Sequence, residues 1–571
     1  MKRLMIGALA ALPLFSITAF AGERVGDFSL IDQNGDFHHM AWYDDHKAIA
    51  FLVQVNGSEQ THAAAADYAR MLSRFDADGV EFMMLNPMGE SRSSIKQDLE
   101  ALALQMPVLI DDAQIISEAM GVDKSGEAFL FDPRSFEVIY RGNVAGLEKA
   151  LEEVVVGQSI STPRVAMTGS DVHYSAQSHS TNVSYSNDVA PILAENCATC
   201  HRVGGIAPFA MDSHAMVQGW SPMIREVLMT KRMPPGQIDP HVGKFSNDYV
   251  LAVEDQQKLI NWIEAGSKKD GDIDPLAELT WPATKWALGE PDLILTVPPQ
   301  SIPATGVLDY ITVEVPIELD RDRWVRASQY IPGDRTVLHH TLNDLVPPGA
   351  TGRRGFLGGG DPNQANITAY IPGAEPAIEP PNTGGLLKAG STLRLQLHYT
   401  TTGKETVDAS EIGVWFYPEG EIPAERMSGA CACIFPMGWT NITPYDPNFE
   451  LRQSVTLKQD AYMQSFLPHM HFRGKSMRFT AYYPDGTEQP LINIANYNYN
   501  WQISYKLEEP ILMPAGTRIE AVGAYDNSTQ NKANPDPSRS VPWGDQSWDE
   551  MFFGAMSWKN VDQSPSGGGG Q

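Results

Sequence analysis

Four cysteines are the only thiols of this 571-residue chain, and they occur as two close pairs. The first pair lies in CATCH (197–201), where two residues separate Cys197 from Cys200 and His201 follows directly. Two thiols one helical turn apart can bond to the two vinyl groups of one porphyrin, and the adjacent histidine can then ligate the iron. A zinc site would need two further ligands at matching spacing. The segment therefore predicts one covalently attached haem c.

The sixth iron ligand is predicted among the methionines and histidines that follow. Met233 in TKRMPPG is the expected ligand, because a thioether on the far face of the haem raises its reduction potential. The segment resembles small bacterial cytochrome c domains, which carry such a methionine–proline pair. The competing candidates are Met211, Met216, Met223, Met229 and His241.

The second pair, Cys431 and Cys433 in GACACIFP, leaves two interpretations open. A mutual disulfide across one residue is strained, whereas reduced thiols could hold a metal transiently. With only four cysteines in the chain, a framework stapled by disulfides is excluded.

Histidines are the most informative residues of the C-terminal half. In LPHMHF, the strand period of two would aim both histidines at one metal. In VLHHTL, neighbours on a regular strand diverge, so a shared metal requires a bulge or loop. Incidental histidines would scatter singly, so the joint pattern favours metal sites. The five histidines beyond His241 are His339, His340, His398, His469 and His471.

These motifs resemble those of the copper type II, ascorbate-dependent monooxygenases, the family of peptidylglycine α-hydroxylating monooxygenase and dopamine β-monooxygenase. The resemblance covers about residues 290–558 and implies two β-sandwich domains that hold one copper each. One copper would take the H-H pair and the histidine of LQLHY, namely His339, His340 and His398, in a strand that keeps Gln396. This copper would store and deliver an electron.

The other copper implied by the resemblance would be the catalytic one. Its ligands would be His469, His471 and Met551, the last in SWDEMFFG. Imidazole holds copper in both oxidation states, and a soft thioether favours Cu(I), the state that meets O2. An open position would let O2 bind and abstract a hydrogen from a substrate C–H bond.

The resemblance also limits the substrate. Peptide-hydroxylating members hold the substrate carboxylate with an arginine two residues before H-x-H, and with an asparagine and a tyrosine two and four residues after the copper methionine. This chain has Leu467, Phe553 and Ala555 at those places. Since Leu467 cannot form a charge-assisted hydrogen bond, we expect a less charged, more apolar substrate than a peptide ending in glycine.

The N-terminal part reads as an α/β domain that resembles the thioredoxin-fold redoxins by pattern. A buried strand (47–55), a helix (61–75), a strand (80–86) and a terminal hairpin are expected. The loop VNGSEQTH (55–62) has no cysteine where those proteins have their nucleophile, and Gly126 stands in place of their cis-proline. Thiol exchange needs a thiolate, so this domain cannot perform it. Two interpretations remain: the domain is a docking module, or it is a degenerate remnant.

The predicted fold is therefore multidomain: a thioredoxin-like α/β domain, a small α-helical cytochrome c, and two tandem antiparallel, jelly-roll-like β-sandwiches. Short alternating segments after residue 290 predict the sandwiches. The expected boundaries are a signal peptide (1–21), the redoxin-like domain (22–156), a Ser/Thr-rich linker (157–185), the cytochrome (186–270), the sandwiches (290–430 and 431–560) and a disordered tail (561–571).

The opening MKRLMIGALAALPLFSITAFA predicts export to the periplasm or another outside compartment. The charge of −28 becomes −30 when Lys2 and Arg3 leave with the signal, which argues against nucleic-acid partners and anionic membrane surfaces. No later apolar run predicts a membrane span.

Together the motifs predict a copper monooxygenase that uses O2, a small organic substrate and an external donor (ascorbate, a cytochrome or a quinol-linked protein), with two copper ions and one haem. The alternative is a non-catalytic electron-transfer or copper-binding protein. A peroxiredoxin-type reductase is disfavoured by the missing cysteine.

Overall fold

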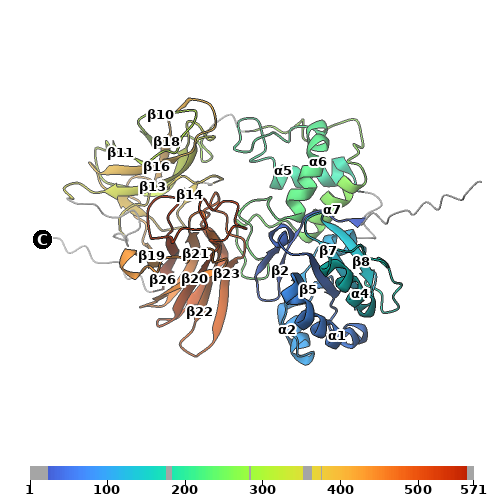
Figure 1. The fold of residues 1–571 in the computed structure, drawn as a ribbon. Helices are drawn as coiled ribbons and strands as arrows, with labels where there is room; N and C mark the ends of the chain where they lie inside the picture. The colour runs from blue at the N-terminus through green and yellow to red at the C-terminus, as the bar shows by residue number, and fades with distance from the viewer. Residues whose placement is uncertain (1–22, 175–182, 282–284, 351–362, 374–375, 562–571) are drawn as a thin grey trace, which may run out of the picture. The chain divides into compact units, whose positions relative to one another are not determined.

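The computed structural model describes residues 23–174, 183–281, 285–350, 363–373 and 376–561 (Figure 1). The predicted signal peptide and nearly all of the predicted tail lie outside these ranges. The described residues divide into two compact units. The first is essentially His39–His173 with residues 23–28, and the second runs from Tyr174 onwards and includes Ser29–His38.

The first unit is thioredoxin-like and contributes the strands β1-β8-β7-β4-β5-β6, in that order, to a mixed sheet. Strands β4, β5 and β6 are parallel, and β7 and β8 are antiparallel to their neighbours. Strand β4 is buried along its whole length, as its apolar sequence AIAFLV requires. The elements are β1 (Glu23–Arg24), β2 (Ser29–Asp32), β3 (Phe37–His39), β4 (Ala48–Val53), α1 (Glu59–Phe75), β5 (Val80–Asn86), α2 (Arg92–Ala101), β6 (Val108–Ile110), α3 (Ile115–Ala119), β7 (Ala128–Asp132), β8 (Glu137–Gly142) and α4 (Val144–Val155).

Polar side chains occupy the place of the redoxin nucleophile. Ser58 caps α1 by accepting the backbone N–H of Thr61, and its hydroxyl donates to Ser125 at 2.9 Å. Gly126, in place of the cis-proline, has a φ of +72°, and a Cβ there would lie 2.7 Å from the backbone carbon of Gln60. The close approach of this backbone to α1 therefore requires glycine.

Part of the predicted linker (157–185) packs against the first unit. Arg141 of β8 donates its backbone N–H to Pro163 and accepts that of Val165, at 3.0 Å each. Val172 is buried and donates its backbone N–H to Asp123. Isolated apolar residues in a polar segment give no periodic signal, although they suffice to pack it onto a sheet.

The second unit begins with a helical region around one apolar core. Its elements are the π-helix η4 (Tyr185–Val189), α5 (Ala190–Asn196), α6 (His214–Met229) and α7 (Val253–Glu264). Helix α7 ends as the sequence predicts: Gly266 takes a φ of +91°, and Ser267 donates its backbone N–H to Trp262.

Two pairs of antiparallel sheets follow, each packed around its own core (Figure 1). The first pair is β11-β16-β13 and β14-β12-β18-β9, with β15 beside β12 and β10-β17 apart; the second is β19-β26-β21-β24 and β20-β25-β22-β23. The predicted multidomain order, a thioredoxin-like domain and then antiparallel sandwich-like sheets, is confirmed. The strands are β9 (Leu293–Thr296), β10 (Gln300–Ile302), β11 (Ile311–Pro316), β12 (Arg323–Ile331), β13 (Leu338–Val346), β14 (Ala377–Ile378), β15 (Gly385–Leu387), β16 (Thr392–Tyr399), β17 (Thr406–Asp408), β18 (Glu411–Phe416), β19 (Met427–Ile434), β20 (Phe449–Thr456), β21 (Ala461–His469), β22 (Gly474–Tyr482), β23 (Glu488–Ile494), β24 (Tyr505–Met513), β25 (Arg518–Tyr525) and β26 (Phe552–Asn560).

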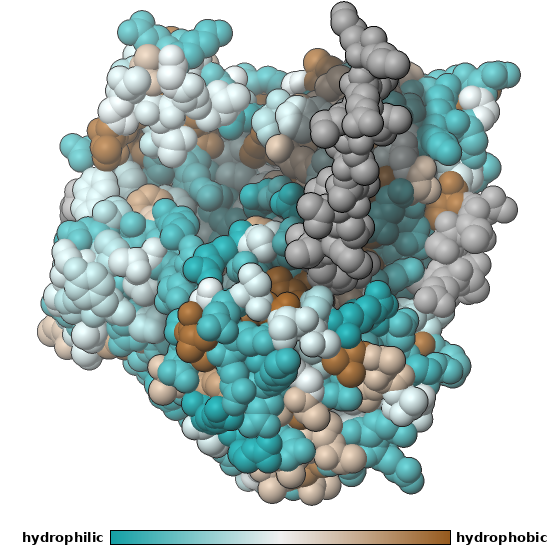
Figure 2. All heavy atoms as spheres, turned by 45° about the vertical axis from the view of Figure 1, so that its right-hand side comes forward, coloured by the Kyte–Doolittle hydropathy of each residue, from teal (hydrophilic) through white to brown (hydrophobic). Residues whose placement is uncertain are grey.

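One face of the surface can be followed in Figure 2. On the face shown in Figure 2, hydrophilic residues predominate and apolar residues form only small separate spots. None of the helices in the described ranges is long and apolar enough to cross a membrane.

Candidate functional site

The first histidine group lies where β13 pairs with β16. The register shifts between Leu338 and His340, so His339 is the extra residue of a β-bulge. The Nδ1 atoms of His339 and His340 are 2.8 Å apart. His340 stands opposite His398 in the register, with 3.8 Å between ring centroids. The bulge that the H-H motif requires is present, and the three histidines lie together.

These three imidazoles are held in the neutral form. Burial lowers the pKa of His339 to about 4 and that of His398 to about 2, and it lowers the pKa of His340 well below its usual value. His398 Nε2 lies 2.8 Å from Gln396 Oε1 and donates to it, which leaves Nδ1 unprotonated. This Nδ1 and His340 Nε2 are buried without a hydrogen-bond partner. A metal ion would satisfy such nitrogens.

The second histidine group lies at the end of β21. His469 is the last residue of the strand and His471 follows, with ring centroids 5.2 Å apart and planes nearly perpendicular. His469 Nδ1 lies 2.6 Å from Gln502 Oε1, and His471 Nδ1 lies 3.2 Å from the carbonyl of Asp549. Burial lowers the pKa of His469 to about 4 and that of His471 to about 3. With Nδ1–H donated to oxygen, Nε2 of each ring is free to bind a metal.

The D-E-M motif holds this segment in place through its carboxylate. Glu550 is fully buried and accepts the backbone N–H groups of His471 and Arg473, at 2.8 and 2.7 Å. Burial raises the pKa of Glu550 to about 8, opposed by these hydrogen bonds and by the Arg473 guanidinium. Glu550 therefore ties the H-x-H segment to the residues that lead into β26, the first of which is Met551.

Met551 is brought to the same place through packing. Its side chain is 7% exposed and lies in an apolar cluster with Cys433 and Phe553. The ring of Phe553 stacks on His469, with 5.6 Å between centroids. Met551 and His469 thus share Phe553 as a packing neighbour.

The donor sets fit copper, although the groups are not finished metal sites. Across the described ranges, no three side chains of His, Cys, Asp and Glu already form a metal-binding arrangement. In the first group an ion would replace the contact between His339 and His340. In the second the third donor would be the thioether of Met551. Three imidazoles, and two imidazoles with a thioether, are donor sets that copper prefers.

An aromatic side chain lies between the two groups. Tyr499 stacks on His339 with 4.7 Å between centroids, and it meets His471 edge-on at 6.4 Å. Its hydroxyl is 2.7 Å from Ser547 Oγ, which is also 2.8 Å from the hydroxyl of Tyr310. Hydrogen bonds and ring contacts therefore join the two sandwiches at the candidate site.

The CATCH segment lies in the turn after α5. Cys197 and Cys200 are free and half-buried, and burial raises the pKa of Cys197 to about 12. His201 Nδ1 lies 3.1 Å from the carbonyl of Phe209, and the two rings are 4.6 Å apart. Donation from Nδ1 leaves the Nε2 atom of His201 available to ligate iron. Two free thiols beside one oriented imidazole suit the covalent attachment of a haem.

The CATCH segment lies near the first histidine group. Burial raises the pKa of the Cys200 thiol, opposed by the charges of nearby arginines that include Arg335, between β12 and β13. Arg335 also lies close to Tyr370, whose carbonyl accepts the backbone N–H of Thr341 at 2.9 Å. Thr341 directly follows His340 in the chain.

The sixth haem ligand stays a prediction. Met233 is half-buried in the loop after α6 and donates its backbone N–H to Val227. The alternatives divide by exposure: Met211 and Met229 are buried, whereas Met216, Met223 and His241 are exposed.

Sequence reasoning missed the residues that support the histidines. Gln502, Tyr499 and Ser547 lie in loops, and no spacing in the sequence points to them. Glu550 had a signal, because a carboxylate that leads directly into an apolar run (Met551–Phe553) calls for a buried partner.

No family model matches the sequence, and no curated protein does. The N-terminal thioredoxin-like domain resembles thiol–disulfide oxidoreductases among solved structures. A hypothetical protein from Sinorhizobium meliloti 1021 is 20% identical over 28% of this chain and 97% of its own, with a TM-score of 0.25. A putative thiol:disulfide interchange protein DsbE from Chlorobium tepidum is 17% identical over 24% and 94%, with a TM-score of 0.21. Peroxidoxin BcpB from Mycobacterium tuberculosis is 15% identical over 24% and 93%, with a TM-score of 0.20.

Proposed function

We propose that this protein is an exported copper monooxygenase that hydroxylates a C–H bond of a small apolar molecule and receives electrons through a covalent haem. The observation that carries the proposal is the meeting of two groups of buried, neutral donors, on either side of Tyr499. When bound, copper would supply O2 activation and haem would supply one-electron transfer, for R–H + O2 + 2e⁻ + 2H⁺ → R–OH + H2O.

The two histidine groups would have different roles because their donor atoms differ. The three imidazoles of the first group would hold the electron-storing copper, and the thioether of the second would favour the reduced ion that meets O2. Gln502 and the carbonyl of Asp549 would fix the tautomers of the second group. The ligands would be His339, His340 and His398 for one ion, His469, His471 and Met551 for the other, and Cys197, Cys200, His201 and Met233 for the haem.

The position of the CATCH segment supports electron entry at the first group. Arg335 lies near both Cys200 and Tyr370, and the Tyr370 carbonyl accepts the backbone N–H of Thr341, which follows His340. The signal peptide supports export, where covalent haem attachment takes place.

The substrate side of the second group supports an apolar molecule. On β21 and β26, His469 is opposite Phe553 and Leu467 is opposite Ala555. None of these four side chains can pair with a carboxylate as an arginine does. A carboxylate buried there would cost several kcal/mol, a loss in binding of about 10² to 10³.

Metal analysis and oxygen consumption test the proposal together. We expect two copper ions and one haem per chain, and copper-dependent O2 uptake with reductant that rises with substrate. The haem should survive denaturing electrophoresis, except in the Cys197→Ala/Cys200→Ala variant. Zinc in place of copper, or copper without any hydroxylated product, would favour the non-catalytic alternative.

The substrate class has its own test. Metabolite profiling of a deletion strain under copper-replete conditions should reveal an accumulated apolar compound, which the purified protein then hydroxylates. Rapid hydroxylation of glycine-extended peptides, with no action on neutral apolar compounds, would contradict the assignment of Leu467 and Ala555.

A further inference from the structure

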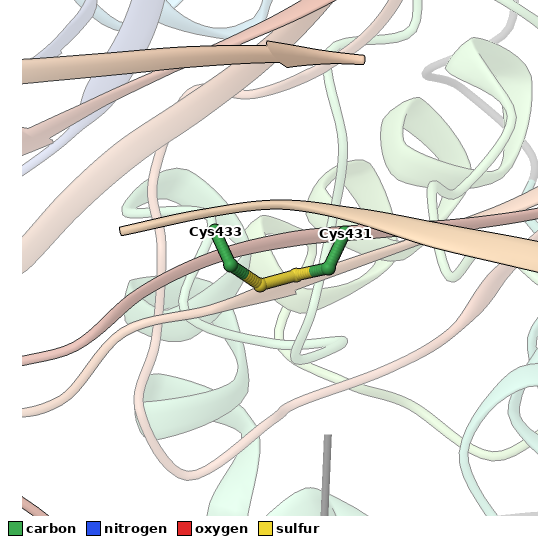
Figure 3. The surroundings of a disulfide bond; sticks show 2 residues. All are labelled: Cys431 and Cys433. Atoms are coloured by element: carbon green, nitrogen blue, oxygen red, sulfur yellow. A yellow bond between two sulfur atoms is a disulfide. The ribbon is translucent and has the colours of Figure 1, made fainter. Parts of the chain in front are cut away.

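Cys431 and Cys433 lie on the opposite face of β19 from the core of the second sandwich. Ala432 and Ile434 point into that core, whereas Cys433 belongs to the separate cluster with Met551. The period of two along a strand places both cysteines on one face. The structure joins them as a disulfide, with 5.0 Å between their Cα atoms (Figure 3).

The register of the sheet brings this face to the second histidine group. Cys433 is opposite Phe553, which is in turn opposite His469 on the next strand. Two strand spacings amount to about 10 Å, so the pair and His469 are close neighbours on one sheet face. Cys433, 8% exposed, also packs in the cluster that contains Met551.

The other cysteine faces open space. Cys431 lines a cavity of about 810 Å³, together with Ser465, Ala555 and Ser557 from the neighbouring strands. One sulfur is thus open to an incoming molecule while the other is packed beside a candidate copper ligand.

A purely structural role explains this pair poorly. The stabilisation that a disulfide gives to a fold grows with the length of the loop it closes. This one closes over a single residue inside a strand that β26 already pairs along its whole length.

We propose that Cys431 and Cys433 are a two-electron thiol–disulfide couple that reduces copper held at the neighbouring site; this rests on the proposed function. The two thiols lose two protons and two electrons and form one S–S bond, while the Cu(II) of the neighbouring second group and the Cu(II) of the first group each take one electron and become Cu(I). An external dithiol entering the cavity then attacks Cys431, breaks the S–S bond, and leaves as its own disulfide after its second thiol resolves the mixed disulfide. Cys197 and Cys200 would be committed to haem, so the dithiol belongs to another molecule.

The test uses the full haem-loaded, copper-free protein. After reduction and removal of the reductant, anaerobic alkylation should label two thiols per chain, as measured by mass. Addition of two equivalents of Cu(II) should abolish both labels and yield two Cu(I) per chain in a chelator assay. The haem spectrum is followed throughout, because ferrous haem is a competing reductant.

Two variants serve as controls. Cys431→Ser/Cys433→Ser should yield no thiol-derived Cu(I). In His469→Ala/His471→Ala, thiol oxidation should slow by about tenfold or more, since copper is no longer held beside the pair. A native disulfide that a small external dithiol cannot reduce, or equal oxidation rates with and without the histidines, would overturn the proposal.

The failure of each proposal has a different signature. If the proposed function fails, wild-type protein shows no copper bound at His469 and His471. If only the thiol couple fails, copper binds there and stays as EPR-visible Cu(II) while both cysteines remain open to alkylation.

Discussion

The two histidine groups differ in how far the protein prepares them for a metal. In the second group, each imidazole donates its Nδ1–H to a fixed oxygen, of Gln502 or Asp549. In the first, Gln396 and Asn500 accept from His398 and His339, whereas His340 faces His339 and two buried nitrogens have no partner. Both imidazoles of the second group are therefore oriented before any ion arrives, which suits O2 chemistry, whereas in the first group His340 depends on the ion for a partner.

The groups also present different nitrogens. Gln396 takes the Nε2–H of His398 and leaves Nδ1, whereas Gln502 takes the Nδ1–H of His469 and leaves Nε2. Glutamine thus fixes opposite tautomers at the two places. The comparison implies that the two copper ions are distinguishable by ligand chemistry and respond separately to substitution.

The largest expected effect is loss of the second group. His469→Ala/His471→Ala should bind one copper per chain and hydroxylate nothing, because O2 has no reduced ion to meet. The matched variant His340→Ala/His398→Ala should also keep one copper, now at the second group. Copper analysis with product detection by mass spectrometry checks both variants. Retention of two ions in either variant would show that the two groups do not each bind one copper.

Removal of the thioether should separate binding from reaction. Met551→Leu keeps the size and apolar packing of the side chain, so both copper ions should remain. Hydroxylation should fall by about 10²-fold, equivalent to about 2.7 kcal/mol in the barrier, since the ligand that favours Cu(I) is gone. An unchanged rate would show that Met551 is only a core residue.

The sequence predicted more of the metal donors than of their surroundings. The H-H pair predicted a bulge or a loop, because two neighbouring histidines on a regular strand cannot share a metal. The structure has a bulge at His339. The H-x-H spacing likewise placed His469 and His471 together. Gln502 and Tyr499 were out of reach, since they come to the site through loops whose course depends on tertiary packing.

The same limit applies to the rest of the fold. Alternating patterns predicted strands such as β16 and β25 closely, because one face of each is buried. The state of Cys431 and Cys433 stayed open, and the packing of Val165 and Val172 onto the first unit was missed. In both cases the deciding contacts join segments that carry no periodic signal.

A smaller effect is expected from the two glutamines. Gln502→Leu should weaken copper binding at the second group by about 10- to 100-fold, and Gln396→Leu should do so only at the first, because each removes the acceptor that orients one imidazole. Competition with a copper chelator, followed by EPR, measures the copper affinity of each group separately. Equal weakening of both ions by either variant would show that the groups are not independent.

The smallest effect concerns stability without metal. His398 Nδ1 is buried without a partner in the first group, and such a nitrogen costs about 1–3 kcal/mol. His398→Leu exchanges this polar ring for an apolar side chain, at the loss of the bond to Gln396. We therefore expect the copper-free variant to unfold at or above the denaturant midpoint of copper-free wild type.

His471→Leu is the matched change in the second group, where the carbonyl of Asp549 would lose its donor, and it should lower the midpoint. Added copper should stabilise the wild type through both groups. In His398→Leu it should give no stabilisation through the first group. Destabilisation of the copper-free protein by His398→Leu to the same extent as by His471→Leu would mean that both groups are equally prepared.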